Sequence, residues 1–158
     1  WSFETEGAIY SKPSIDDINK DGLLELVFGS CDNNIYCINE DGRKLWSYTS
    51  DFWITHTPLL FDIDGDGKKE VIFGSYDSHI YILEGEGAYN YGYIPGLSGI
   101  VSQEGNYSDI QSESPGQIKG KRIWMLKTPG IIVGCAISEK SVFVQTKQGL
   151  LIKASLQN

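Results

Sequence analysis

Residues 17–30 read DINKDGLLELVFGS, and residues 62–75 read DIDGDGKKEVIFGS. Both stretches lie within longer segments, residues 1–42 and 46–87, which align without a gap at an offset of 45. Tryptophan, proline, aspartate, glycine and glutamate positions coincide along this alignment. Chance does not keep one register for so long, so the two segments are copies of one structural repeat.

A third, weaker copy begins near Trp124. Residues 120–124 read GKRIW and correspond to residues 42–46, which read GRKLW. An insertion separates this copy from the second one. We therefore expect a single domain over residues 1–158, with repeat units at about 1–45, 46–87 and 120–158 and an insertion at about 88–119.

Each copy contains short apolar runs separated by polar turns, which is typical of β-strands. No stretch shows a sustained helical period. The expected strands lie at residues 25–29, 35–38, 44–48, 57–61, 70–74 and 80–83. Four strands in a unit of about 45 residues predict an all-β protein of about three four-stranded antiparallel β-propeller blades.

Three blades are fewer than the four to eight of a usual propeller. Residues 1–5 have the pattern of an outer strand without its blade, and the last blade, ending near Ala154, lacks an outer strand. The chain also starts at Trp1 and not at Met. We therefore expect a piece of a larger propeller or a subunit that closes a ring with others, so that further blades come from a longer chain or a second subunit.

One tryptophan recurs at a fixed place in each unit: Trp1, Trp46 and Trp124. Blades that stack face to face share a core, and a large side chain at one repeated position is suited to fill the space between them. An aromatic ligand platform is the alternative, but a position locked to the repeat favours packing.

An acidic loop precedes the apolar run in the first two units. Oxygen-bearing side chains stand at loop positions 1, 3, 5 and 9, with glycine at position 6. Calcium takes six to eight hard oxygen ligands, and a carbonyl at position 7 can add one. The expected ligands of two calcium sites are Asp17, Asn19, Asp21, Leu23 and Glu25 in the first unit and Asp62, Asp64, Asp66, Lys68 and Glu70 in the second.

The alternative is a plain polar turn, which needs Asp, Asn and Gly but no acid at position 9. An EF-hand is disfavoured because its bidentate Glu at position 12 is replaced by Phe28 and Phe73. The extra acid, Asp64 in place of Asn19, predicts tighter binding in the second unit. The third unit has only SEKS at residues 138–141, so we expect no third site.

Residues 17–30 and 62–75 resemble the FG-GAP repeat of integrin α-subunit propellers and its bacterial relatives. In that family the acidic loop joins two strands of a blade and binds calcium, and a Phe-Gly pair follows. The resemblance implies the same role for the loop positions named above. Residues 38–48 and 120–124 also look like the Trp-docking repeats of quinoprotein-type propellers.

The formal net charge of −8 argues against nucleic acid and anionic membranes as partners. No apolar run is long enough for a membrane span. No phosphate loop, dinucleotide fingerprint or nucleophile elbow occurs, and we assign no catalytic residue. His56 and His79 align with Ser11 and Asn34, which predicts variable surface positions.

Two further features leave alternatives open. Cys31, Cys37 and Cys135 are an odd number of cysteines, so at least one is unpaired within the chain, and a bridge between the first two is one option. The insertion carries a group of tyrosines suited to contact a protein or glycan, or to pack on one another. They are Tyr89, Tyr91, Tyr93 and Tyr107.

Two functions fit these observations. The first is a calcium-stabilised, non-catalytic interaction module that is extracellular, on the cell surface or periplasmic. The alternative is a partial propeller domain of a secreted enzyme, either polysaccharide-acting or quinoprotein-like. Removal of residues 88–119 discriminates them, because it should abolish partner binding in the first case and spare activity in the second.

Overall fold

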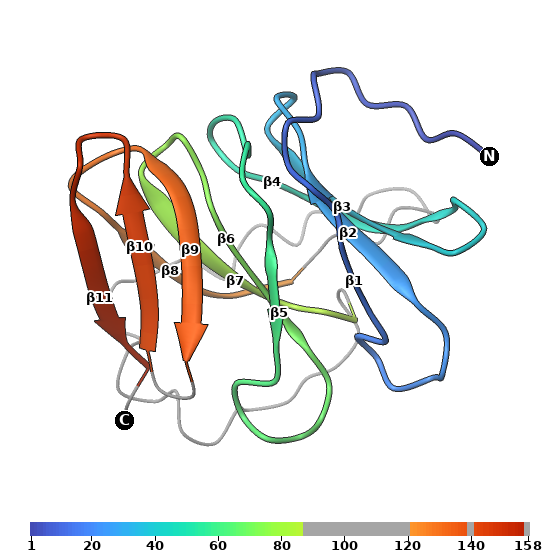
Figure 1. Ribbon diagram of the computed structural model, residues 1–158. Coiled ribbons are helices and arrows are strands. Elements are labelled where there is room, and N and C mark those ends of the chain that lie inside the picture. The colour runs from blue at the N-terminus through green and yellow to red at the C-terminus, as the bar shows by residue number, and fades with distance from the viewer. Residues whose placement is uncertain (87–120, 139–140, 157–158) are drawn as a thin grey trace, which may run out of the picture.

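The computed structural model describes residues 1–86, 121–138 and 141–156, and these form three antiparallel sheets (Figure 1). The tyrosines predicted to bind a partner lie in the insertion, outside the described residues. No described segment forms a helix with the length and apolar character needed to cross a bilayer. The prediction of an all-β protein built from propeller blades is confirmed by this arrangement and by the comparisons reported below.

The first two sheets have four strands each, in sequence order. The first contains β1 (Ser14–Asp16), β2 (Glu25–Gly29), β3 (Asn34–Asn39) and β4 (Lys44–Thr49). The second contains β5 (Leu59–Phe61), β6 (Glu70–Gly74), β7 (His79–Glu84) and β8 (Lys121–Lys127). The third has three strands in the order β11 (Leu151–Ser155), β10 (Ser141–Thr146) and β9 (Ile132–Ser138).

The strand register reproduces the sequence repeat. Trp46 lies opposite Cys37 in the first sheet, and Trp124 lies opposite Ile82 in the second. In both sheets the register shifts directly after this pair, between Cys37 and Ile38 in β3 and between Ile82 and Leu83 in β7. The alignment offset of 45 is therefore also the offset between equivalent backbone positions.

The second sheet is buried on both faces, which explains its continuous apolar strands. Val71 and Phe73 pack towards the first sheet, in a cluster that also holds Trp46. Ile72, between them in sequence, packs towards the third sheet with Ile132. The inner strands complete this contact, since β5 touches both β1 and β9.

The predicted role of the repeated tryptophan holds for Trp46 and is wrong for Trp1. Trp46 is 1% exposed and lies between the first two sheets. Trp1 is 72% exposed, because no sheet lies on its other side among the described residues. Its Nε1 still donates to the carbonyl of Glu40 at 2.9 Å, as Trp46 Nε1 donates to Gly85 at 2.7 Å.

Residues 1–13 form no strand, unlike the predicted outer strand at residues 1–5. Their side chains nevertheless pack as the repeat predicts. Phe3 contacts Phe28 and Tyr36 edge-on, at the place that Tyr48 takes against the second sheet. At the other end, β11 is the unpaired edge of the three-stranded sheet, so the last described blade lacks its outer strand, as predicted.

The Phe-Gly pairs of the repeat mark close contacts between blades. A Cβ atom on Gly29 would collide with Ile54, and one on Gly74 would collide with Ile132. Both glycines end a strand, and the phenylalanine before each lies on the opposite face, where Phe28 packs near Phe3 and Phe73 packs in the cluster of Trp46. Any larger residue in place of either glycine would push the next inner strand away.

Cys31, Cys37 and Cys135 are all free thiols, so the optional bridge between the first two is absent.

His56 is a buried residue, which contradicts the prediction of a surface position. It is 9% exposed, and its Nε2 accepts the backbone N–H of Gly74 at 2.8 Å. Its Nδ1 lies 3.1 Å from the carbonyl of Thr57, so the ring is neutral and carries its proton on Nδ1. Ser11 does the same in the first unit, where its Oγ accepts the N–H of Gly29 at 2.9 Å. The two residues differ in size but share one hydrogen-bonding role.

Burial lowers the pKa of His56 in the folded chain, although two backbone hydrogen bonds oppose this shift. The unfolded chain takes up a proton at a pH of about 6.5, so the free energy of unfolding should fall below that pH. His56→Ser, which copies Ser11, should remove this part of the pH dependence. It should also cost about 1–3 kcal/mol at neutral pH through the lost volume. Urea unfolding of both proteins across this range provides the measurement, and parallel pH profiles would contradict the assignment.

Candidate metal centre

The two acidic loops lie at the same end of neighbouring blades. Residues 17–24 connect β1 to β2, and residues 62–69 connect β5 to β6. Lys69 N–H donates to the carbonyl of Ile18 at 2.9 Å. Lys20 Nζ donates to the carbonyl of Asp66 at 2.7 Å. The loops are therefore part of the junction between the first two sheets.

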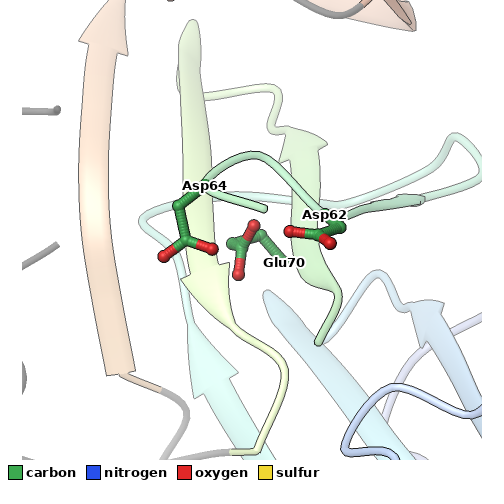
Figure 2. Close-up of side chains that lie close together, drawn as sticks. All are labelled: Asp62, Asp64 and Glu70. Atoms are coloured by element: carbon green, nitrogen blue, oxygen red, sulfur yellow. The ribbon is translucent and has the colours of Figure 1, made fainter. Parts of the chain in front are cut away.

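In the second loop three carboxylates converge. One oxygen from each of Asp62, Asp64 and Glu70 lies within 4.8 Å of the others. Figure 2 shows the two aspartates on the arch of the loop, with Glu70 between them at the start of β6. Asp64 is exposed and Asp62 half-buried, whereas Glu70 is 5% exposed. The group is thus open to solvent on one side and closed by the sheet on the other.

Glu70 is a buried acid whose pKa lies above its ordinary value. Burial raises its pKa to about 7, and the charges of Asp64, Asp66 and Asp62 add to this effect. A hydrogen bond from the N–H of Ile63 to its Oε2, 2.7 Å long, opposes the shift only in part. The ionised carboxylate is therefore costly near neutral pH, and a bound cation would offset that cost.

The backbone of the second loop is curled by its own aspartates. Asp62 Oδ1 accepts the N–H of Gly65 at 2.7 Å, and Asp64 Oδ1 accepts that of Asp66 at 3.1 Å. Asp66 Oδ1 accepts the N–H of Lys68 at 2.8 Å. Asp66, a predicted ligand, is not one of the three converging acids. Gly67 has φ of 85°, which explains glycine at loop position 6.

The first loop uses more of its oxygens on its own backbone. Both carboxylate oxygens of Asp17 accept N–H groups, from Asp21 at 3.1 Å and from Gly22 at 2.9 Å. Asn19 Nδ2 donates to Asp21 Oδ2 at 3.0 Å. In the described part of the chain only the second loop brings three acids together as closely as 4.8 Å. The two loops share a sequence pattern, but they do not share this convergence.

Glu25 nevertheless repeats the role of Glu70. It is 2% exposed, and its Oε2 accepts the N–H of Ile18 at 3.0 Å. Burial raises its pKa, with smaller contributions from Asp21, Asp17 and Asp16. Leu23 at loop position 7 is 53% exposed.

Two residues at the loops were missed by the sequence reasoning. Lys20 links the first loop to the second, and Glu86 pairs with Lys68 at 2.6 Å. The repeat alignment could have drawn attention to Lys20, because this charged residue aligns with Gly65 in the second unit. The third unit has no loop of this kind, since β9 ends at Ser138 and β10 begins at Ser141.

The donor set fits calcium. Three carboxylates offer hard oxygens at a spacing that one ion can bridge, and the solvent side leaves room for waters. An ion there would join the loop to the first residue of β6, because Glu70 belongs to both. Its effect would be to stabilise the blade.

The sequence of the chain is similar to that of one family of known proteins. Residues 1–91 match the family of the lambda-carrageenase β-propeller domain. The lambda-carrageenases of Pseudoalteromonas sp and Pseudoalteromonas carrageenovora are each 41% identical to the chain over 46 residues. That stretch is 29% of this chain and 5% of each relative.

Two solved structures share the fold. BamB from Moraxella catarrhalis has a TM-score of 0.59 at 14% identity, over 99% of this chain and 37% of BamB. BBS1N, in its complex with ARL6DN, has a TM-score of 0.52 at 10% identity, over 98% of this chain and 43% of that chain. The chain thus spans less than half of each. Since the family match covers more than half of the chain and the sheets have the strand order of propeller blades, the chain belongs to the lambda-carrageenase β-propeller domain family.

Proposed function

We propose that the chain is a calcium-stabilised propeller portion of a polysaccharide-acting enzyme. Convergence of Asp62, Asp64 and Glu70 at the junction between blades is the observation that supports the calcium role. The match to the lambda-carrageenase propeller domain supports the enzymatic setting. This favours the secreted-enzyme hypothesis over the non-catalytic interaction module.

Calcium acts here as a structural ion. The loops correspond to FG-GAP loops, with the second site stronger because its acids converge. Proteins with extracellular calcium modules bind the ion with dissociation constants of about 10⁻⁴ to 10⁻³ M. An extracellular or periplasmic location supplies calcium in that range. The chemistry of polysaccharide cleavage resides elsewhere in the enzyme or at the centre of the closed ring.

The enzymatic part is tested with the natural polypeptide that carries these blades. In calcium-containing buffer it should lower the viscosity of a carrageenan solution, because cleavage shortens the chains. EDTA should slow this loss by loosening the blade. An unchanged carrageenan viscosity in the presence of calcium would contradict the enzymatic setting and leave the calcium role to the melting experiments described in the Discussion.

A further inference from the structure

Three aromatic residues, two exposed and one half-buried, form a cluster at the end of the second sheet opposite the acidic loops. Phe52 and Trp53 lie on the connection from β4 to β5, and Tyr76 lies on the turn from β6 to β7. The ring centroids of Phe52 and Trp53 are 5.2 Å apart, and those of Trp53 and Tyr76 are 6.2 Å apart. Phe52 is 45% exposed and Trp53 is 43% exposed. We call these three residues the aromatic cluster.

Within the described residues, a missing neighbouring blade does not explain this exposure. The second sheet has the first sheet on one side and the third on the other (Figure 1). Trp1 and Leu151 are also exposed, but they belong to the outermost segments of the described array. Phe52 and Trp53 are therefore exposed even though a described sheet lies on each side of the second one.

The fold itself does not require these rings. One backbone hydrogen bond ties the two segments together in every unit: Tyr76 to Trp53 at 2.9 Å, Cys31 to Ala8 at 2.9 Å, and Lys147 to Ile131 at 2.8 Å. The first unit thus has Gly7 and Ala8 where the second has Phe52 and Trp53. A shared scaffold with aromatic residues in one copy indicates a role outside packing.

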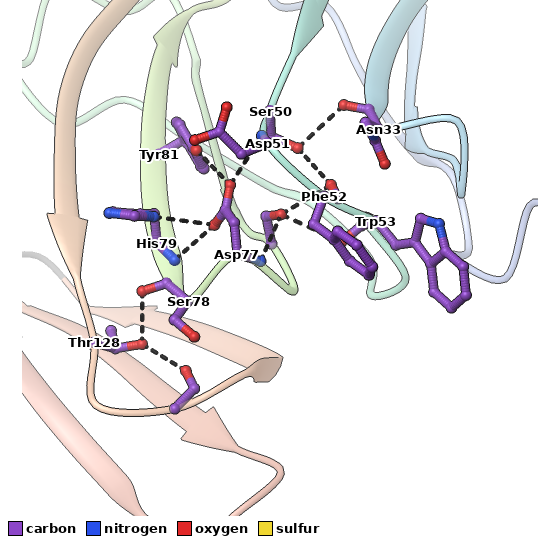
Figure 3. Close-up of polar contacts among 12 residues, drawn as sticks. Asn33, Ser50, Asp51, Phe52, Trp53, Asp77, Ser78, His79, Tyr81 and Thr128 are labelled. Atoms are coloured by element: carbon purple, nitrogen blue, oxygen red, sulfur yellow. Dashed lines mark hydrogen bonds and ion pairs between the residues drawn. The ribbon is translucent and has the colours of Figure 1, made fainter.

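Hydrogen bonds fix the backbone of the connection that carries Phe52 and Trp53. The carbonyl of Phe52 accepts two hydroxyl groups, Ser50 Oγ at 2.7 Å and Ser75 Oγ at 2.9 Å. Beside it, the N–H of Asp51 donates to Asp77 Oδ2 at 3.1 Å (Figure 3). Rigid presentation lowers the entropy lost when a ligand binds. The exposed side chain of Asp51 lies on the Tyr81 side of this connection, away from the rings of Phe52 and Trp53 (Figure 3).

We propose that the aromatic cluster is a binding subsite for a pyranose ring of a polysaccharide chain, an inference that rests on the proposed function. A pyranose presents C–H groups on its faces and hydroxyl groups around its edge. The negative face of an aromatic ring attracts those C–H groups, and stacking removes apolar surface from water.

The size of the cluster favours a sugar over a protein. Phe52 and Trp53 together expose about 200 Å², taking roughly 200–250 Å² for each side chain. A specific protein interface buries about 800 Å² on each partner. One or two sugar rings match the smaller area.

Native gel electrophoresis of the chain in gels that contain carrageenan tests the subsite. Wild type should migrate more slowly than in a plain gel. Trp53→Ala should raise the apparent dissociation constant by roughly tenfold or more, and Trp53→Phe should retain most of the retardation. Ala8 occupies the equivalent position, so the alanine variant should still fold and unfold in one cooperative thermal transition. Tyr10→Thr is the matched control, because Tyr10 is 72% exposed and aligns with Thr55 in the second unit. It should behave as wild type.

Gels with poly(vinyl sulfate), which has charge but no sugar ring, separate stacking from ionic attraction. Equal retardation of wild type and Trp53→Ala by carrageenan would overturn the subsite. It would also be overturned if carrageenan did not retard wild type at all, or if poly(vinyl sulfate) retarded wild type as strongly as carrageenan does. A wild-type dimer that Trp53→Ala converts to a monomer in light scattering would also overturn it, in favour of a contact between copies. Carrageenan viscosity tests the enzymatic setting and calcium-dependent melting tests the calcium role. Either of these can fail without changing the result of the gel experiment on the subsite.

Discussion

Trp46→Ala is expected to lower the free energy of unfolding by about 3–5 kcal/mol, the usual cost of truncating a buried aromatic residue. Trp46 is 1% exposed and fills the space between the first two sheets. Its Nε1 donates to Gly85, which lies just beyond β7 of the neighbouring blade. The variant loses both the buried ring and the hydrogen bond. Because domains are stable by only about 5–15 kcal/mol, this loss should be visible at once in urea unfolding.

Trp1→Ala is the matched control. Trp1 makes the equivalent hydrogen bond, to Glu40, but is 72% exposed. We expect the control to change the free energy of unfolding by less than about 1 kcal/mol. Equal losses in the two variants would show that the hydrogen bond, and not the burial between blades, is what matters at this repeated position.

Calcium is expected to stabilise the chain, chiefly through the second loop. At about a hundredfold excess over the dissociation constant, one site adds about 2.7 kcal/mol to the free energy of unfolding. Glu70→Gln should remove most of this gain, because Glu70 is one of the three converging acids. In EDTA the same variant should be at least as stable as wild type at pH 8, because burial and three neighbouring aspartates make the ionised Glu70 costly. Thermal unfolding with calcium and with EDTA measures both effects.

Two variants serve as controls for that experiment. Asp41→Asn removes an exposed acid from the turn between β3 and β4 and should leave the calcium effect unchanged. Glu25→Gln, in the first loop, should reduce it less than Glu70→Gln, since the acids of that loop do not converge to the same degree. A melting temperature that is indifferent to both calcium and EDTA in wild type would contradict the calcium role.

The fold was predictable because the repeat preserves register. The offset of 45 between Glu25 and Glu70 is also the offset between the strand pairs Asp16–Glu25 and Phe61–Glu70. A sequence comparison within one chain therefore located the strands and the incomplete last blade. It also identified both acidic loops and the greater strength expected of the second.

The surroundings of individual side chains were not predictable in the same way. Trp1 and Trp46 occupy aligned positions of the repeat, but among the described residues only Trp46 has a blade on each side. Serine and histidine look unrelated, yet Ser11 and His56 accept the same backbone N–H. Carboxylates converge only if the loop turns their oxygens toward the candidate metal centre and not toward its own backbone N–H groups. The sequence pattern that the two loops share does not determine this.

The most direct test of the calcium centre is an anomalous difference map from a crystal of the chain grown with calcium. We expect a peak beneath the second loop, with oxygens of Asp62, Asp64 and Glu70 at the distances of about 2.3–2.6 Å that are usual for calcium. A well-defined loop with no anomalous peak, and with those carboxylates turned outward into solvent, would contradict the assignment.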